Sequence, residues 1–174
     1  MAKRTTRRLD HAVAFAIWPD IDLLVNNVGV FLPGSVHGEV DGSLESTMAL
    51  NLYSPYYLTR TLLPGMMKRK TGHIINMCSI ASFMSYPNGG SYTISKFALL
   101  GLSKVLREEM KPHGIKVTSI MPGATWSASW GEAPFALDRL MPAADVAEAV
   151  VACTRMGSSS VVEEIIIRPQ LGDL

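Results

Sequence analysis

Residues 72–106 read GHIINMCSIASFMSYPNGGSYTISKFALLGLSKVL, and this stretch decides the fold. Its isoleucine-rich start, from His73 to Ser79, predicts a strand that is buried on both faces. The amphipathic pattern that begins near Ser91 predicts a helix running to Lys111, where Pro112 follows. The stretch therefore predicts a strand that leads through a short connection into a long helix packed on the sheet.

Three polar side chains lie around this junction, namely Ser79, Tyr92 and Lys96. Tyr92 and Lys96 are four residues apart, so on a helix they project from the same face about one turn apart. An ammonium group close to a phenol favours the phenolate, and this would let the tyrosine act as an acid or a base at neutral pH. Taken singly, each has a plainer explanation. Ser79 could end a strand by bonding its own backbone, and the other two could be an ordinary amphipathic pair.

The remainder of the chain repeats the alternation of strand and helix. Apolar runs predict further strands, and amphipathic patterns predict further helices. Pro55 and Pro64 should bend or divide the helix expected over about 44–70. The expected strands span about 21–30, 115–123 and 161–169, and the expected helices about 44–70 and 142–156. Alternating elements predict an α/β fold, a Rossmann-like parallel sheet of about four strands with helices on both faces.

Composition limits the classes of function. The 174 residues are 48% hydrophobic and 18% charged, which is enough for the core of one domain over 1–174. A net charge of +1 does not suggest nucleic acid or a membrane as a partner, so a small molecule is the expected ligand. Cys78 and Cys153 form neither a disulfide framework nor a metal cluster, and a reducing, cytoplasmic location is expected.

The first 20 residues have no clear element. Their basic start and short apolar run resemble a signal or transit peptide, but Asp10 and His11 interrupt the approach to that run. A helix remnant that ends at Pro19 is the alternative.

The ordered motifs resemble those of the short-chain dehydrogenase/reductase family, and most of all its single-domain bacterial-type reductases. The resemblance runs from about Ile21 to the C-terminus. It rests on NNVG at 26–29, Asn51 in the following helix, Ser79 thirteen residues before Tyr92, YxxxK at 92–96 and the turn Pro122-Gly123.

The resemblance implies an oxidoreductase that uses NAD or NADP to interconvert a ketone and a secondary alcohol. Tyr92 would exchange a proton with the substrate oxygen, and Ser79 would donate a hydrogen bond to that oxygen. Lys96 would lower the pKa of the tyrosine and bind the nicotinamide ribose. Asn51 would bind a water that connects Lys96 to solvent.

The resemblance also assigns the contacts to the cofactor, and it implies no metal site. Gly29 would allow the backbone to approach the adenosine side, and Asn26 would tie neighbouring strands together. Ser127 stands where a threonine usually contacts the nicotinamide carboxamide. The full set of expected cofactor contacts is Asn26, Asn27, Gly29, Tyr92, Lys96, Pro122, Gly123 and Ser127. Trp126 and Trp130 could line a substrate pocket or cover the edge of the core.

One departure from the family stands at the start of the chain. No glycine precedes Gly29, so no glycine-rich phosphate turn comes before the NNVG strand. The strand that would normally lie beside it is also expected to be missing, which would leave Leu23 to Val25 as an exposed apolar edge. The sequence thus predicts an N-terminally truncated enzyme or one that depends on a homo-oligomer, a dimer or a tetramer. The choice between NAD and NADP stays open.

Two functions follow from this pattern. The first is the NAD(P)-dependent oxidoreductase with Ser79, Tyr92, Lys96 and Asn51 as its catalytic residues. The second is a catalytically silent fold fragment, or an oligomeric interaction module, that keeps these residues without binding the dinucleotide.

Overall fold

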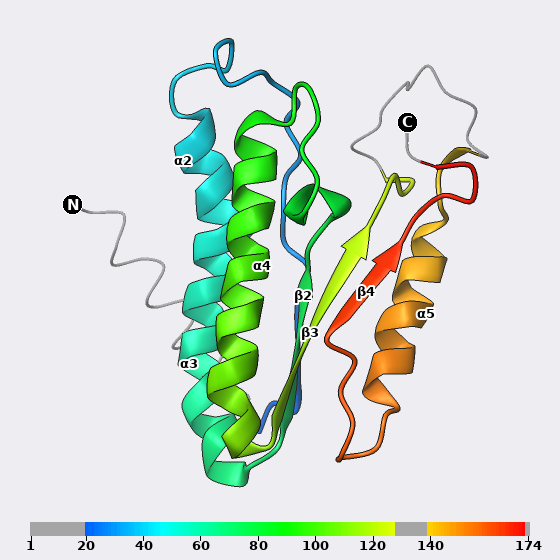
Figure 1. The fold of residues 1–174 in the computed structure, drawn as a ribbon. Helices are drawn as coiled ribbons and strands as arrows, with labels where there is room; N and C mark the ends of the chain where they lie inside the picture. Colours follow the sequence, from blue (N-terminus) through cyan, green and yellow to red (C-terminus); the bar gives the residue numbers. More distant parts are fainter. Residues whose placement is uncertain (1–19, 128–138, 173–174) are drawn as a thin grey trace.

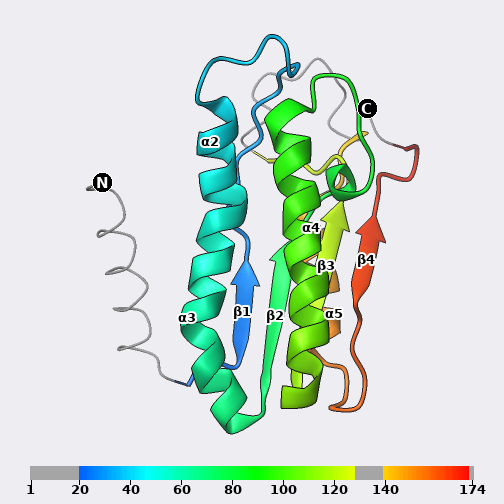
Figure 2. The same cartoon turned by 60° about the vertical axis from the view of Figure 1, so that its left-hand side comes forward.

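The computed structural model describes residues 20–127 and 139–172, and within them it contains a sheet of four strands. All neighbouring strands are parallel, and their order in the sheet is their order in the chain. The strands are β1 (Leu23–Asn26), β2 (Gly72–Met77), β3 (Ile115–Pro122) and β4 (Glu164–Ile167). The predicted parallel α/β sheet is confirmed, and Figure 2 shows its strands pointing the same way.

Helices cover both faces of this sheet, as predicted. On one face lie α2 (Ser43–Met48), α3 (Ser54–Arg69) and α4 (Gly90–Met110), and on the other lies α5 (Ala143–Thr154) (Figure 1). Short 3-10 turns, Ile80–Ser82 and Lys111–His113, precede and follow α4. The layers of helix, sheet and helix are those of a Rossmann-like domain.

The alternation of side chains along β2 divides the core between the two faces. Ile74 packs with Leu62, Met66 and Leu106 beneath α3 and α4, whereas Ile75 packs with residues on the α5 side. Both isoleucines are completely buried. Burial of one such side chain contributes about 2 to 3 kcal/mol, so the apolar run of β2 is explained by a strand that is covered twice.

The long helical pattern after β1 is interrupted at one of its two prolines. Between α2 and α3 the chain forms a π-helix, Ala49–Tyr53, and the Ser54 N–H donates to Ala49 O. Pro55 has no N–H, and this loss favours the irregular turn before it. Pro64 lies inside α3 without dividing it, so the predicted break occurs at the first proline only.

Strand β1 forms an edge of the sheet in the described part of the chain. Leu24 is buried, but Leu23 and Val25 are 44% and 37% exposed. The predicted exposure is therefore confirmed at Leu23 and Val25 but not at Leu24, whose side chain belongs to the core.

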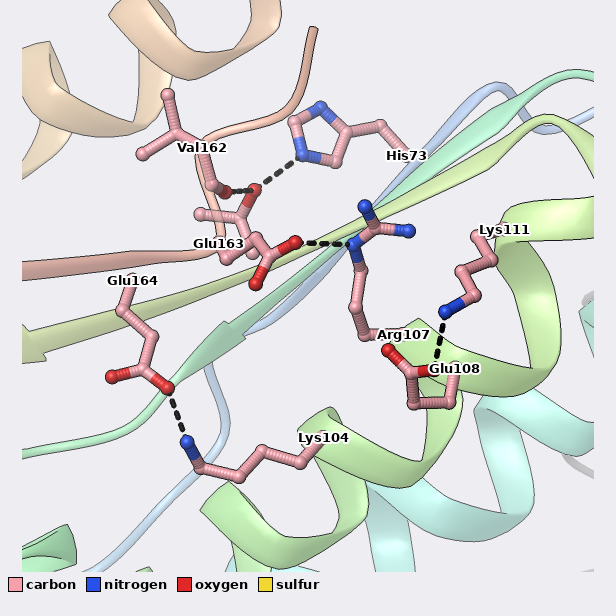
Figure 3. Close-up of polar contacts among 9 residues, drawn as sticks. His73, Lys104, Arg107, Glu108, Lys111, Val162, Glu163 and Glu164 are labelled. Atoms are coloured by element: carbon pink, nitrogen blue, oxygen red, sulfur yellow. Dashed lines mark hydrogen bonds and ion pairs between the residues drawn. The ribbon is translucent and has the colours of Figure 1, made fainter.

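Towards the amino ends of the strands, polar contacts join β2, β3, the start of β4 and α4 (Figure 3). Thr118 Oγ1 donates to Val162 O at 2.6 Å and lies 2.7 Å from His73 Nε2. Because the hydroxyl proton is used on the carbonyl, His73 Nε2 must carry a proton and donate to Thr118. Burial first, and then the charge of Lys116, lower the pKa of His73 to about 4.

Several expectations concern other parts of the chain. The terminal segment 1–19 and Trp130 lie outside the described residues. Both cysteines are free and buried. Within 20–127 and 139–172, no helix has the length and apolar character needed to cross a bilayer, and no group of side chains there could hold a metal ion.

Candidate active site

The predicted catalytic residues gather at the carboxyl edge of the sheet. Ser79 follows β2 by two residues, Gly29 follows β1, and Pro122 is the last residue of β3. Tyr92 lies in the first turn of α4, which begins at this same edge. Ligands of open parallel sheets bind outside the carboxyl ends of the strands, so the position alone favours a binding site.

Ser79 is held by a short capping motif. Its hydroxyl accepts a hydrogen bond from Ala81 N at 3.1 Å, and its own N–H donates to Ser82 Oγ at 3.2 Å. The predicted strand ended at Ser79, whereas β2 ends at Met77 and Ser79 caps a 3-10 turn. The capping contact uses an acceptor lone pair and leaves the hydroxyl proton to be donated, which the site requires.

Tyr92 and Lys96 face each other on α4, as their spacing predicts. Lys96 Nζ lies 5.7 Å from the centre of the Tyr92 ring and donates to Met77 O at 2.7 Å. The lysine side chain is only 6% exposed. A backbone carbonyl at the end of β2 thus fixes the ammonium group beside the phenol.

Burial dominates the protonation of both side chains. It raises the pKa of the Tyr92 phenol, a hydrogen bond with Ser79 acts to lower it, and Cys78 acts to raise it. Burial also lowers the pKa of the Lys96 ammonium to about 8, against a smaller opposing effect of Cys78. The sequence predicts that Lys96 lowers the tyrosine pKa, but here the ammonium is directed to Met77 O and desolvation prevails.

Asn51 is completely buried within the π-helix, and its amide joins three parts of the fold. Val30 N–H donates to its Oδ1 at 2.8 Å, and its Nδ2 donates to Val30 O at 3.1 Å and to Ser95 Oγ at 2.9 Å. Ser95 Oγ in turn donates to Tyr92 O at 2.7 Å. The side chain therefore fixes the loop after β1 against the helix that carries the tyrosine.

In the loop after β1, Gly29 brings the backbone close to Asn51 and Lys96. A Cβ on Gly29 would lie 3.3 Å from Asn51 Oδ1 and 3.6 Å from Lys96 Nζ, so a side chain there would crowd both groups. Within the described part of the chain, Lys96 donates to Met77 O, and an ammonium has three donors. Lys96 could therefore also bind the hydroxyls of a ribose.

Of the other residues expected to contact the cofactor, some are held by hydrogen bonds within the fold and some are exposed. Asn26 is buried, and its Nδ2 donates to Asn76 Oδ1 at 2.8 Å and Thr59 Oγ1 at 3.2 Å, so it ties β1 to β2 and α3. Asn27 is exposed beside Gly29. Gly123 N–H donates to Ile167 O at 2.7 Å and anchors the turn after β3 to β4. Ser127 is exposed and does not join the buried cluster.

Sequence reasoning missed several residues that complete the site. Ser95 precedes the lysine of the motif and could have been noticed from that position. The carbonyl of Met77 carries no sequence signal, because any residue supplies one. Phe31 and Glu39 lie in an irregular loop, where periodicity gives no information. Both contact the start of α4.

This arrangement defines a parallel-sheet domain that carries a half-buried tyrosine beside a buried serine, lysine and asparagine at the carboxyl edge. A sequence model of the family described as short chain dehydrogenase matches residues 3–134. The chain belongs to this family.

Relatives and solved structures agree with this assignment. A sepiapterin reductase of Chlorobaculum tepidum is 34% identical over 155 residues, and an uncharacterized oxidoreductase of Staphylococcus saprophyticus is 31% identical over 150. The alignments cover 88% and 86% of this chain and 64% of each relative. The chain thus spans less than two thirds of the length of these relatives.

Among solved structures, serine dehydrogenase from Escherichia coli superposes with a TM-score of 0.77 at 29% identity, covering 87% of this chain and 65% of that one. A metagenomic short-chain oxidoreductase in complex with NADP gives a TM-score of 0.76 at 29% identity, with 94% and 68% covered. The fold and family of the chain are those of oxidoreductases.

Proposed function

We propose that this chain carries the catalytic part of an NAD(P)-dependent oxidoreductase that interconverts a ketone and a secondary alcohol. The observation that supports it most is the cluster at the carboxyl edge of the sheet, in which the half-buried Tyr92 stands with the buried side chains of Ser79, Lys96 and Asn51. A small carbonyl compound or alcohol is the substrate class.

In the reducing direction, Tyr92 donates the proton. A tyrosine phenol is protonated at neutral pH, and burial raises its pKa further, so Tyr92 holds the proton that it transfers to the carbonyl oxygen of a substrate. Ser79 donates a hydrogen bond to the same oxygen and stabilises the negative charge that develops there. The bound dinucleotide supplies or accepts the hydride.

Lys96 holds the ribose of the dinucleotide and returns the proton to the tyrosine. A pKa of about 8 lets its ammonium release and regain a proton near neutral pH. The side chain of Asn51 is occupied by Val30 and Ser95, so the water of the proton relay would bind to its main-chain carbonyl. Pro55, four residues on, has no N–H to donate to that carbonyl.

The cofactor in this proposal is NAD or NADP. The donors of Lys96 fit the hydroxyls of a nicotinamide ribose, and Gly29 leaves the backbone beside Lys96 without a side chain. The metagenomic oxidoreductase and a closed form of serine dehydrogenase were both solved with the NADP cofactor, which supports a nicotinamide dinucleotide here.

A Tyr92→Phe variant tests the mechanism. It keeps the ring and removes the proton donor, so turnover of NADPH with a panel of small ketones should fall by about 100-fold or more. Tyr57→Phe, at an exposed position on α3, is the matched control and should retain wild-type turnover. Full activity in the Tyr92→Phe variant would contradict the proposal.

A catalytically silent domain, the alternative that the sequence also predicts, is the second candidate. The silent domain would keep the cluster but bind no dinucleotide. Calorimetric titration of the chain with NADH and NADPH separates the two candidates. Micromolar binding supports the oxidoreductase and argues against the silent domain.

We further propose that the chain forms a homo-oligomer in the cytoplasm. The exposed apolar edge of β1 and the exposed aromatic side chains on α3 and α4 support self-association. Two buried free thiols suit a reducing compartment, which fractionation of the native cell would check.

A further inference from the structure

The loop that follows β1 folds back onto the start of α4. Gly34 N–H donates to Asn88 O at 2.9 Å, just before the helix. Five residues further on, Glu39 receives two hydrogen bonds from Ser91. The Ser91 N–H donates to Oε1 at 2.8 Å, and the Ser91 hydroxyl donates to Oε2. A loop distant in sequence thus holds the helix at the residue before Tyr92.

Helix α4 has no cap of its own. Gly89 precedes it without a side-chain hydrogen bond, and its first turn contains no acidic residue. The first N–H groups of a helix need acceptors, and a carboxylate there also interacts favourably with the helix dipole. Glu39 supplies both, although it lies 52 residues away from Ser91.

Two glycines make this contact possible. A Cβ on Gly90 would lie 2.1 Å from Glu39 Oε1 and 2.4 Å from Gly34 O, so a side chain at this position would expel the carboxylate. A Cβ on Gly34 would lie 2.7 Å from Glu39 Cγ. The loop and the start of the helix therefore fit together closely where both lack side chains.

The same loop also contacts the catalytic ring. The ring centres of Phe31 and Tyr92 are 4.8 Å apart, with the planes at 74°, an edge-to-face arrangement. Glu39 therefore holds the backbone at Ser91 while Phe31 packs against the next side chain. Ser91 itself is 2% exposed.

We propose that Glu39 is a positioning residue that, together with Phe31, fixes the first turn of α4 and hence the orientation of the Tyr92 phenol. This inference rests on the proposed function of Tyr92. Without the carboxylate the first turn would fray, and the phenol would leave the position that it shares with Ser79 and Lys96. Small displacements of a reacting group lower the rate strongly.

Amide hydrogen exchange tests the contact without any cofactor. In a Glu39→Ala variant the amides of residues 91–93 should exchange about fivefold faster than in the wild type, the effect of losing a helix cap. The amides of residues 99–103, in the middle of α4, should be unchanged. Glu45→Ala, at an exposed position in the first turn of α2, is the matched control and should leave residues 91–93 unaffected.

Steady-state kinetics test the consequence for the reaction. Glu39→Ala should lower kcat by about 10-fold to 100-fold and leave the KM for the dinucleotide within about twofold. Glu39→Gln should recover most of the rate, because its amide oxygen still accepts from Ser91 N–H and its amide nitrogen can donate to Ser91 Oγ. If Glu39 only stabilised the fold, Glu39→Ala would have a lower melting temperature but would not show a fall in kcat at an unchanged KM.

The outcomes separate this inference from the proposed function. If Glu39→Ala turns over as fast as the wild type, or if amide exchange at residues 91–93 is unchanged, the positioning role is wrong. The proposed oxidoreductase activity would not be affected by either result. Rates as low in Glu39→Gln as in Glu39→Ala would also overturn it. Faster exchange at residues 91–93 in a chain without turnover would support the contact while the oxidoreductase fails.

Discussion

The buried ammonium of Lys96, which we propose to act in the reaction, destabilises the fold. Its ammonium is buried, and burial lowers its pKa from 10.5 to about 8, so the folded chain holds the charged form less well than the unfolded chain does. At neutral pH that difference destabilises the fold by about 3 kcal/mol. Active sites often carry such a cost, because the chemistry needs a group that the core would exclude.

A Lys96→Met variant measures this cost. It should be more stable than the wild type by about 1 to 3 kcal/mol at neutral pH, since the lost bond to Met77 O offsets part of the gain. Above about pH 8 the folded wild type releases its proton while the unfolded chain keeps it, so wild-type stability rises and the gap narrows towards pH 10.5. Urea unfolding at neutral pH and at about pH 10 checks this. An equal gap at both would contradict it.

His73 should make the fold sensitive to acid. Its pKa is about 4 when folded and 6.5 ordinarily, so between these values the unfolded chain binds a proton that the folded chain does not. Stability therefore falls as the pH drops through this window, by about 2 to 3 kcal/mol at pH 4.5. A His73→Gln variant keeps a donor for Thr118 and should lose this component. His37→Gln, in an exposed loop, should follow the wild type; identical acid profiles for all three would contradict the assignment.

The sequence carried information about the site only where the residues follow a spaced motif. Tyr92 and Lys96 could be paired from helical spacing alone, and their contact is as expected. The pKa of Tyr92 could not be predicted from the sequence, because burial of the ring depends on how Phe31 and its loop cover it. Glu39 could not be found either, since its partner Ser91 is far along the chain and neither lies in a periodic pattern.

At the level of elements, the π-helix is the feature that a helical pattern predicts least well. Pro55 indicated a break, but a proline can bend, divide or begin a helix. Here it stands in the first turn of α3, and the irregular turn before it places Asn51 inward towards Val30 and Ser95. Strand and helix positions were predictable within a few residues, because apolar periodicity fixes them.

A Pro55→Ala variant tests the role of this turn. The alanine N–H could donate to Asn51 O and favour a regular α-helix, which would rotate the Asn51 amide away from Val30. We expect kcat to fall by about 10-fold while the free energy of unfolding changes by less than about 1 kcal/mol. Pro64→Ala, inside α3, is the matched control and should keep its activity. Wild-type kcat in the Pro55→Ala variant would show that the π-helix has no part in the reaction.

At the scale of the whole molecule, the helical face of α2 to α4 carries exposed apolar side chains. Tyr53, at the end of the π-helix, and Tyr57 of α3 are both exposed, and the exposed Ile94 and Phe97 share a face of α4. Figure 2 shows these helices side by side over one face of the sheet. Large exposed apolar patches usually mark contacts with other chains.

Charge introduced into this face should therefore disrupt self-association. We expect the wild type to elute as a dimer or larger species in size-exclusion chromatography with light scattering, and Tyr57→Glu to shift it towards the monomer. Leu171→Glu, which is also at an exposed apolar position but outside this face, is the control. A wild type that is monomeric at all concentrations would contradict the proposed oligomer.

Direct hydride transfer to a carbonyl carbon is the reaction that we propose for the cluster around Tyr92. The most direct measurement supplies NADPH or NADH that carries deuterium at the transferable position, together with a panel of small ketones, and follows the label by mass spectrometry. We predict deuterium on the carbinol carbon of the product alcohol with the wild type, and almost none with Tyr92→Phe. A wild type that forms no labelled alcohol, or a Tyr92→Phe variant that forms as much as the wild type, would contradict this account.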